Sequence, residues 1–304
     1  MRVVILGSAA GGGFPQWNCG CRNCRSLRLG TFCGKARTQT QVAVSADGGA
    51  WFLLNAGPDL RLQIEATPQL HPRDGNRDSP IAGVVLSSAD LDQIAGLLSL
   101  RELQPFHIYC TRELRTILRE ENSVFAMLNR IPEQACWREI RPGENFTLQA
   151  RNADTGMACE PISLGSRYPA YVRAKGLGEG ASLGLILTSP QGRRLGYFPA
   201  VPALSDSLLR KLETLDVLLF DGTFWSDDEL IRVQGGGATA AEMGHVPVSG
   251  PNGSLSRLAG LRKPRRIFVH VNNTNPILDE SSPEHHQVRD AGWEVAEDGW
   301  QLEL

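Results

Sequence analysis

The sequence of 304 residues predicts a single α/β domain, residues 1–304, built as two β-sheets packed face to face with helices outside. Two observations favour this fold class. Apolar runs of strand length alternate with helical patterns along the whole chain, and the connections between them include both hairpins and crossovers. No internal repeat and no linker composition interrupts this alternation, so a second domain is not predicted.

The first part of the chain begins with an apolar strand that leads into a glycine loop. This loop, Gly7–Gly13, lacks the G-x-G-x-x-G spacing of a dinucleotide-binding turn. Two alternating segments flank Ala46–Gly49 and therefore predict a β-hairpin. The predicted strands are Val3–Leu6, Thr40–Ser45, Trp51–Asn55, Ile81–Leu86 and Phe106–Cys110. One predicted helix begins at Pro58, a second spans Asp90–Leu100, and a third, capped by Thr111, spans Arg112–Glu120.

The second part of the chain continues the alternation but contains one glycine-rich stretch. Ile231–Gly250 shows no strong periodicity and is interpreted as a mobile loop. The chain is expected to end in a hairpin near Trp293–Leu304. The other predicted elements are strands at Phe146–Gln149, Ala158–Leu164, Leu183–Thr188, Arg194–Phe198, Val217–Phe220 and Ile267–Val271, and helices at Ser205–Leu212 and Ser254–Leu261.

Composition limits the classes of function. The 33 acidic and 31 basic residues nearly balance, which predicts no nucleic-acid partner, and no apolar run approaches the roughly 18–20 residues of a membrane span. Only four of the basic residues are lysines, and arginine pairs well with carboxylates, so an anionic small substrate is compatible. Seven cysteines, an odd number, indicate reduced thiols in a cytoplasmic protein together with one metal site.

Three of the cysteines, Cys19, Cys21 and Cys24, stand within six residues. A tight C-x-C-x-x-C turn after the first strand can aim three sulfurs at one point, which suits tetrahedral zinc. The alternatives are three unligated thiols, or a disulfide with one thiol left over. Zinc is favoured because free thiols crowded in this way are prone to oxidation. A fourth ligand must then come from elsewhere in the chain.

Acidic and histidine side chains stand at the ends of later predicted strands. Asp90 and Asp92 follow one strand, while Asp221 and His270 each end another, and His245 lies in the glycine-rich stretch. Each has an ordinary structural explanation: a helix cap, a turn, a structural histidine and a surface loop histidine, respectively. Together they favour a metal site, because carboxylates and imidazoles are both metal ligands.

These features resemble the metallo-β-lactamase superfamily, which implies a metallo-β-lactamase-like four-layer αββα sandwich. The superfamily's first metal motif is H-x-H-x-D-H at a strand-to-helix corner, and the corresponding residues here are Ser88-x-Asp90-x-Asp92-Gln93. Asp92 matches the motif's aspartate, and the three histidines are absent. Asp221 matches the superfamily's bridging aspartate, and His270 matches its late strand-end histidine.

The whole chain resembles one branch of this superfamily, whose members serve the biosynthesis of the redox cofactor pyrroloquinoline quinone (PQQ). The segments that carry the resemblance are Val4–Cys19, Asn55–Leu60, Ala89–Asp92, Gly96–Glu102, Asp221–Trp225, Gly244–Pro247 and His270–Pro276. The resemblance implies a cytoplasmic enzyme that uses iron and dioxygen to hydroxylate the tyrosine ring of a cross-linked Glu–Tyr precursor. That small molecule is the implied partner, with other PQQ-pathway proteins and a second copy of the chain as further candidates.

The resemblance also implies the ligands of a catalytic Fe²⁺. A mononuclear iron site needs two histidines and one carboxylate on one face. Asp92 and His270 would bind the iron, with the pocket completed by Asp90, Gln93, Asp221 and His245. Gln93 stands at the family's histidine position, and its neutral amide is expected to weaken iron binding by about 10-fold or more. Arg101 is a candidate for holding the substrate's carboxylates.

The structural Zn²⁺ has a parallel in related phosphodiesterases of the superfamily. Their fourth ligand is a histidine three residues after the strand-end histidine, and that position is Asn273 here. Either Asn273 supplies its amide oxygen or His270 turns to the zinc, and Asn273 is favoured.

Two other functions compete with the hydroxylase. The loss of the three motif histidines favours a non-catalytic carrier that takes part in the transport of PQQ or its precursor. A dinuclear zinc hydrolase is disfavoured, because two zinc ions need about five or six histidine and aspartate ligands.

Overall fold

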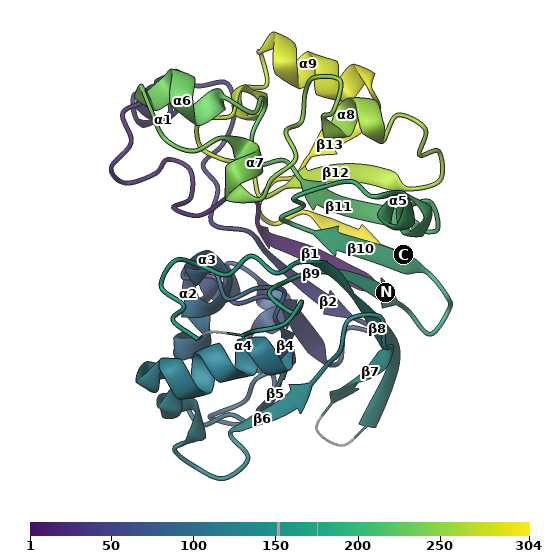
Figure 1. Cartoon of the computed structure of the whole chain (residues 1–304). Helices are drawn as coiled ribbons and strands as arrows, with labels where there is room; N and C mark the ends of the chain where they lie inside the picture. The colour runs from purple at the N-terminus through teal and green to yellow at the C-terminus, as the bar shows by residue number, and fades with distance from the viewer. Residues whose placement is uncertain (151–152, 175) are drawn as a thin grey trace. The chain divides into compact units, whose positions relative to one another are not determined.

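Two units make up the chain in the computed structural model, which describes residues 1–150, 153–174 and 176–304 (Figure 1). Unit 1 comprises Met1–Leu6, Gln41–Arg193 and Gly299–Leu304, and unit 2 comprises Gly7–Thr40 and Arg194–Asp298. The organisation of residues 1–304 as a single domain stays a prediction.

Short apolar segments form the first sheet of unit 1. Its strands, in spatial order, are β14 (Gln301–Glu303), β1 (Arg2–Gly7), β2 (Gln41–Ser45), β3 (Trp51–Leu54), β4 (Ile81–Val85), β5 (Phe106–Cys110) and β6 (Ala135–Glu139). The predicted hairpin is confirmed, since β2 and β3 pair antiparallel with Val42 opposite Leu54. From β3 to β6 the strands are parallel, and the inner ones are buried almost throughout, so they read as continuous apolar runs.

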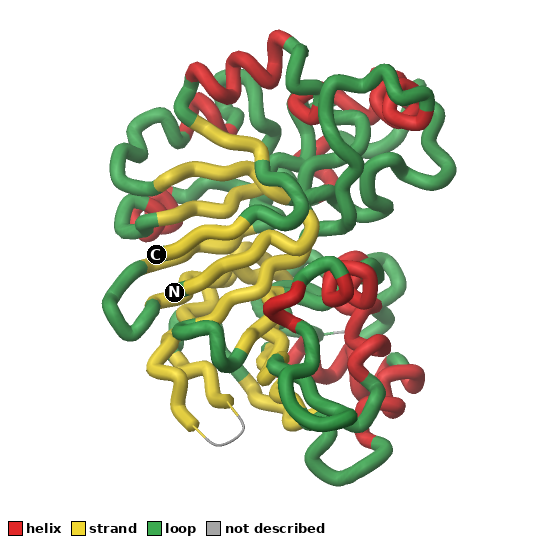
Figure 2. The backbone as a smooth tube through the Cα atoms, turned by 180° about the vertical axis from the view of Figure 1, so that it is seen from behind, coloured by secondary structure: helices red, strands yellow, loops and turns green. Residues whose placement is uncertain are grey.

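Helices cover one face of this sheet (Figure 2). They are α2 (Leu60–Glu65), α3 (Leu91–Ile94), α4 (Arg112–Thr116) and the 3₁₀ segments Ala95–Leu100 and Ser123–Asn129. Their buried leucines and isoleucines, such as Leu60 and Leu114, pack on strand residues such as Leu53 and Ile108. No helix in the described ranges combines the length and apolar character needed to cross a membrane.

A second, antiparallel sheet of unit 1 contains β7 (Phe146–Ala150), β8 (Ala153–Gly165) and β9 (Ser182–Thr188). It faces the first sheet. The ring of Tyr109 on β5 stacks on Phe146 of β7 with centroids 5.1 Å apart, and the backbone N–H of Gln149 donates to the Tyr109 hydroxyl at 2.8 Å. Within unit 1, the predicted arrangement of two sheets face to face with helices outside is therefore confirmed.

Unit 2 contains four parallel strands, β10 (Arg194–Phe198), β11 (Val217–Asp221), β12 (Arg265–Val269) and β13 (Trp293–Val295). Figure 1 shows them with the neighbouring helices α5 (Asp206–Leu212), α8 (Ser254–Arg257) and α9 (Pro283–Asp290). Trp293 stacks on Phe268 with ring centroids 4.2 Å apart and meets the edge of Phe220 at 6.1 Å. These contacts hold β11, β12 and β13 together, so β11 and β12 end side by side.

The predicted terminal hairpin is wrong. β13 pairs in parallel with β12, whereas β14 pairs antiparallel with β1. The Asp298–Gly299 dipeptide resembles a hairpin turn in sequence. Instead, the Asp298 carboxylate accepts hydrogen bonds from the Thr38 backbone N–H at 2.6 Å and from the Ser8 hydroxyl at 2.9 Å, which anchors the chain between the two strands.

The interpretation of Ile231–Gly250 as a mobile loop is also wrong. The structure places the end of α6 (Glu229–Gln234) and all of α7 (Ala240–Met243) in this stretch. Its glycines include two helix C-caps with left-handed backbone angles, Gly235 at φ +76° and Gly244 at φ +87°. Helices this short give almost no periodic signal, and this is why the sequence pattern missed them.

Candidate metal centres

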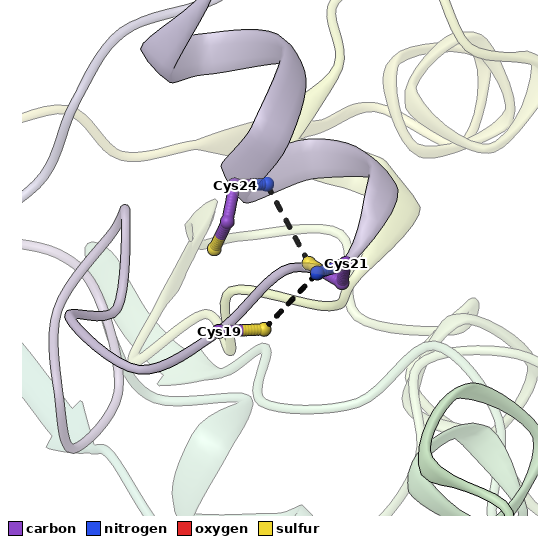
Figure 3. A group of neighbouring side chains, drawn as sticks. All are labelled: Cys19, Cys21 and Cys24. Carbon is purple, nitrogen blue, oxygen red and sulfur yellow. Dashed lines mark hydrogen bonds between the residues drawn. The ribbon is translucent and has the colours of Figure 1, made fainter.

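The three clustered cysteines surround the start of α1 (Arg22–Arg28) in unit 2 (Figure 3). Cys21 caps the helix, and its sulfur accepts the backbone N–H of Cys24 at 3.5 Å. The Cys21 backbone N–H in turn points to the Cys19 sulfur at 3.4 Å. The three sulfurs lie within 4.8 Å of one another. The alternative of a disulfide is wrong, because all seven cysteines are free.

This cysteine cluster fits a zinc ion. Zinc bound to sulfur at about 2.3 Å in a tetrahedron requires sulfurs roughly 3.8 Å apart, and sulfurs that lie within 4.8 Å of one another are near enough to share one ion. Burial, together with the neighbouring Cys24 and Cys19 sulfurs, raises the pKa of Cys21 to about 12. Three thiolates are thus unfavourable at this position unless a cation balances their charge.

The side-chain amide of Asn273 contacts all three sulfurs of the cysteine cluster. Its amide nitrogen Nδ2 is 3.1 Å from the Cys19 sulfur, 3.7 Å from that of Cys21 and 3.3 Å from that of Cys24. Its backbone oxygen accepts the side-chain amide of Asn23 at 3.2 Å, which anchors the residue against α1. Zinc ligation through the oxygen Oδ1 would require a half-turn of the amide, so this role stays a prediction.

A second cluster forms where β11 and β12 end. Asp221 is the last residue of β11, His270 directly follows β12, and the parallel register places Asp221 opposite Val269. His270 has φ +58°, in the left-handed region that a histidine seldom adopts. His245 follows α7, and its backbone N–H donates to the Ala240 carbonyl at 2.9 Å.

The three side chains of the second cluster are buried and in contact. One possible ligand atom from each lies within 4.8 Å of the others. The imidazoles of His245 and His270 stack with ring centroids 5.4 Å apart and an angle of 18° between their planes. His245 is only 8% exposed, so the alternative of a surface loop histidine is wrong.

Four hydrogen bonds hold the Asp221 carboxylate. Its Oδ2 accepts from the Val201 backbone N–H and from His245 Nδ1, both at 2.8 Å. Its Oδ1 accepts from the backbone N–H of Thr223 at 3.0 Å and from the Thr223 hydroxyl at 2.6 Å. A carboxylate offers about four acceptor positions, and these four bonds use them. Because the carboxylate is held in place, Asp221 is suited to orient the imidazole of His245 behind a metal site.

Asp221 is also ionised at neutral pH. Complete burial by itself raises the pKa of a carboxyl group, but the neighbouring His245 and His270 outweigh that effect and hold the pKa of Asp221 below its ordinary value. Gly222, the residue after Asp221, allows a close approach to β12, because a Cβ there would lie 2.8 Å from the Cβ of Phe268.

Thr223 is a functional candidate that sequence reasoning missed. It is 2% exposed, and its hydroxyl lies 2.8 Å from His270 Nδ1 and 3.1 Å from His245 Nδ1. The only signal in the sequence was its position two residues after Asp221, within a segment that carried the family resemblance.

Glu229 connects the loops behind both clusters. It is 3% exposed, and its carboxylate accepts from the Trp225 backbone N–H at 2.6 Å and from the Thr274 hydroxyl at 2.5 Å. Burial raises the pKa of Glu229 to about 7. The residue therefore joins the loop after β11 to the loop after β12, which carries Asn273.

The motif residues Asp90, Asp92 and Gln93 lie in unit 1, at the start of α3. The Gln93 amide donates to Asp92 Oδ2 at 2.9 Å, and its Oε1 accepts the Asn55 side-chain amide at 2.5 Å. The side chain of Asp90 does not cap the helix, and accepts instead from the Ser88 hydroxyl at 2.9 Å. The pairing of Asp92 with His270 stays a prediction, because the two residues belong to different units.

The remaining predicted residue, Arg101, is exposed and lies 3.4 Å from the Glu102 carboxylate. A cavity of about 630 Å³ in unit 1 is lined by residues such as Arg73, His107 and Arg138, and none of the predicted site residues lines it. The role of Arg101 in substrate binding therefore stays a prediction.

Comparison with known proteins gives one match over most of the chain and several over all of it. The family model described as "Beta-lactamase superfamily domain" matches residues 50–271. The chain is 43% identical over 308 residues to coenzyme PQQ synthesis protein B of Methylobacterium sp. (strain 4-46), with all of both chains covered. It is 42% identical over 314 residues to the protein of the same name from Bradyrhizobium diazoefficiens, again with complete coverage.

Solved structures show the same relationship. The crystal structure of Zn²⁺-bound PqqB from Methylobacterium extorquens matches with a TM-score of 0.93 and 41% identity over all of both chains. A diphosphatase of the PhnP family matches with a TM-score of 0.69 and 21% identity, over all of this chain and 98% of its own, and so shares the fold. These matches confirm the predicted metallo-β-lactamase fold.

Proposed function

The chain belongs to the coenzyme PQQ synthesis protein B family of the beta-lactamase superfamily, and we propose that within PQQ biosynthesis it hydroxylates the cross-linked Glu–Tyr precursor. The family supports the pathway. The finer proposal of an iron-dependent reaction rests on one observation: two buried imidazoles, His245 and His270, stand together in front of an ionised carboxylate, Asp221.

This donor set suits ferrous iron. His245 and His270 would hold the ion, and Asp92 is the proposed carboxylate ligand, which completes two histidines and one carboxylate. Bound iron would supply the one-electron chemistry that dioxygen needs to react. Asp221 holds the His245 ring in place through the 2.8 Å contact between Oδ2 and Nδ1. Because the side chains of Asp221, His245 and His270 are all buried, bulk water is kept away from the two histidines.

The reaction sets the conditions of the assay. Insertion of one oxygen atom from O₂ into a ring C–H bond leaves the other atom to depart as water, and it consumes two electrons and two protons. The assay therefore contains the cross-linked Glu–Tyr amino acid, dioxygen and ascorbate as reductant. Arg101 is the proposed partner for the substrate's carboxylates.

We also propose that Cys19, Cys21, Cys24 and Asn273 bind a structural zinc. The sulfur spacing supports this, as does the zinc in the related PqqB structure. A zinc ion there would join α1 to the loop that begins at His270, and so would stabilise the second cluster from behind.

The test is anaerobic loading with Fe²⁺, followed by metal analysis and the hydroxylation assay. One equivalent of iron and a product heavier by one oxygen atom are expected. His245→Ala and His270→Ala should each lose the iron, whereas His286→Ala, a substitution on α9 outside the cluster, should retain it. If the wild-type protein binds no iron and forms no product, the hydroxylase proposal is wrong.

One observation favours the carrier as a second candidate. Gln93 replaces the family's histidine, and both ends of its amide are engaged, by Asn55 and by Asp92. The carrier hypothesis predicts tight binding of PQQ or its precursor without iron. Gln93→His separates the two: a gain of iron and turnover favours a weakened enzyme, whereas unchanged ligand binding without turnover favours the carrier.

A further inference from the structure

We infer that the exposed side of the cysteine-rich segment of unit 2 is a docking surface for an acidic polypeptide. This surface, the arginine patch, consists of Trp17, Arg22, Arg25 and Leu29, and all four residues are exposed. Trp17 and Leu29 are the two most exposed large apolar side chains that the structure describes, at 86% and 71%. The inference goes beyond the proposed function, because none of these residues belongs to either candidate metal cluster.

The charge of this segment has one sign. The first 46 residues contain six basic side chains and no acidic one, although the whole chain has a net charge of −2. Within the described residues Arg22 and Arg25 form no ion pair, whereas Lys35 pairs with Glu297 at 2.6 Å. The two guanidinium groups therefore keep their capacity for a partner's carboxylates, which arginine binds through paired N–H groups.

Helix α1 holds the two arginines on one face. Arg22 and Arg25 are three residues apart, and Leu29, at the C-cap, follows four residues after Arg25, so the three side chains are neighbours on the helix surface. Asn23 is buried, and its side-chain amide donates to the Asn273 carbonyl at 3.2 Å. The helix is therefore anchored to unit 2 through its other side, and the arginine face is left exposed.

The loop before α1 is tied to the helix and carries Trp17. The Arg28 guanidinium donates to the backbone carbonyls of Gln16 and Cys19, which stand on either side of Trp17 in the chain. The Cys19 backbone N–H also donates to the Gln16 carbonyl at 3.1 Å. The backbone of Trp17 is thus held beside α1, and a pre-organised aromatic side chain loses little conformational entropy when it binds.

The chemistry of the arginine patch favours a protein partner. Tryptophan and arginine are the residue types enriched at the energetic centres of protein interfaces. A membrane-binding helix needs a long apolar face, whereas α1 has seven residues and exposes arginines. Two arginines are few for the track of positive charge that follows a nucleic-acid backbone. A second copy on the same patch would bring arginine against arginine. The partner is therefore a segment in which carboxylates flank an apolar side chain.

The experiment measures the fluorescence anisotropy of a labelled peptide in which glutamates flank a central leucine, titrated with the full chain. The peptide should bind, and the same peptide with lysine in place of every glutamate should not. A third peptide, with serine in place of the leucine, should bind more weakly, because it lacks the apolar contact with Trp17. Affinity for the glutamate peptide should fall as salt is added, since the Debye length is only about 10 Å at 0.1 M ionic strength.

Substitutions in the arginine patch identify where the peptide binds. Trp17→Ala and Arg25→Glu should each weaken the glutamate peptide about 10-fold or more, as expected of residues at the centre of an interface. Arg210→Glu makes the same change of charge at an exposed position on α5 of unit 2, and it should leave the affinity unchanged. Trp17→Ala decides the question even if Arg25→Glu does not fold, because it alters a single exposed side chain.

Several results would overturn the inference. The first is no binding of the glutamate peptide, and the second is equal affinity in the wild type and in Trp17→Ala. The third is tighter binding to phosphatidylserine vesicles or to a single-stranded oligonucleotide than to the peptide, lost in Trp17→Ala and Arg25→Glu. Sedimentation that shows dimers of the wild type but monomers of Trp17→Ala would assign the patch to a second copy of the chain instead.

Discussion

The Nδ1 atom of His245 lies 2.8 Å from Oδ2 of Asp221, although 24 positions separate the two residues in the chain. The carboxylate lies at the end of β11, and the imidazole lies just after the end of α7. All four partners of this carboxylate are hydrogen-bond donors, so its two oxygens are both needed.

Asp221→Asn hardly changes the size of the side chain, but it should lower both the stability of the protein and its affinity for metal. Either orientation of the new amide points its NH₂ group at donors, and leaves buried groups unsatisfied at about 1–3 kcal/mol each. We expect a lower free energy of unfolding in denaturant titrations and metal affinity at the second cluster reduced about 10- to 100-fold. The exposed Asp290→Asn is the matched control, and equal behaviour of the two variants would contradict the orienting role.

Removal of zinc should destabilise unit 2. Binding that favours the folded state adds about 4 kcal/mol when free metal is a thousand times its dissociation constant. A chelator, or Cys24→Ser, should therefore lower the melting temperature measured by calorimetry. Cys33→Ser changes an exposed cysteine outside the cluster and should have no effect. An unchanged melting temperature with chelator would show that the three thiols do not hold a structural metal.

Asn55→Ala should disturb the Gln93 side chain although residue 93 itself is unchanged. Asn55 donates to Gln93 Oε1 and accepts the Ser87 backbone N–H at 2.7 Å, and all three residues are buried. Its loss removes three hydrogen bonds, to Gln93 Oε1, to the Ser87 hydroxyl and to the Ser87 backbone N–H, so we expect the free energy of unfolding to fall by about 2–4 kcal/mol. Asn129→Ala, at an exposed site, is the control. A loss smaller than about 0.5 kcal/mol would argue against a stabilising amide network.

Glu229 should make stability depend on pH. Its pKa is about 7 in the folded protein, above the ordinary value of 4.5, so the folded state binds more protons between these values. Stability should then fall as pH rises from about 4.5 through 7, by about 3 kcal/mol at full ionisation. Glu229→Gln should lack this decrease in chemical denaturation across the range, and the exposed Glu213→Gln should keep it. Parallel pH profiles for the wild type and Glu229→Gln would refute the assignment.

Much of the fold was predictable because it depends on local apolar patterns. Strands such as Phe106–Cys110 were predicted at their exact bounds, since a buried parallel strand is a short apolar run ended by polar residues. Elements without such a run were missed or misplaced. α7 is four residues long, and the terminal hairpin failed because Asp298 bonds to Thr38 and Ser8 and does not form a turn.

The sequence by itself determined the chemical inventory: three cysteines within six residues, and Asp221, His245 and His270 as candidates at or near strand ends. Only the tertiary structure decided how these groups are used. The register of β11 and β12 brings Asp221 and His270 together, and the segment after α7 places His245 beside them. The Thr223 hydroxyl contacts both imidazoles. Hydrogen-bond partners across 22 to 47 positions depend on packing in three dimensions, and no local pattern in the chain encodes them.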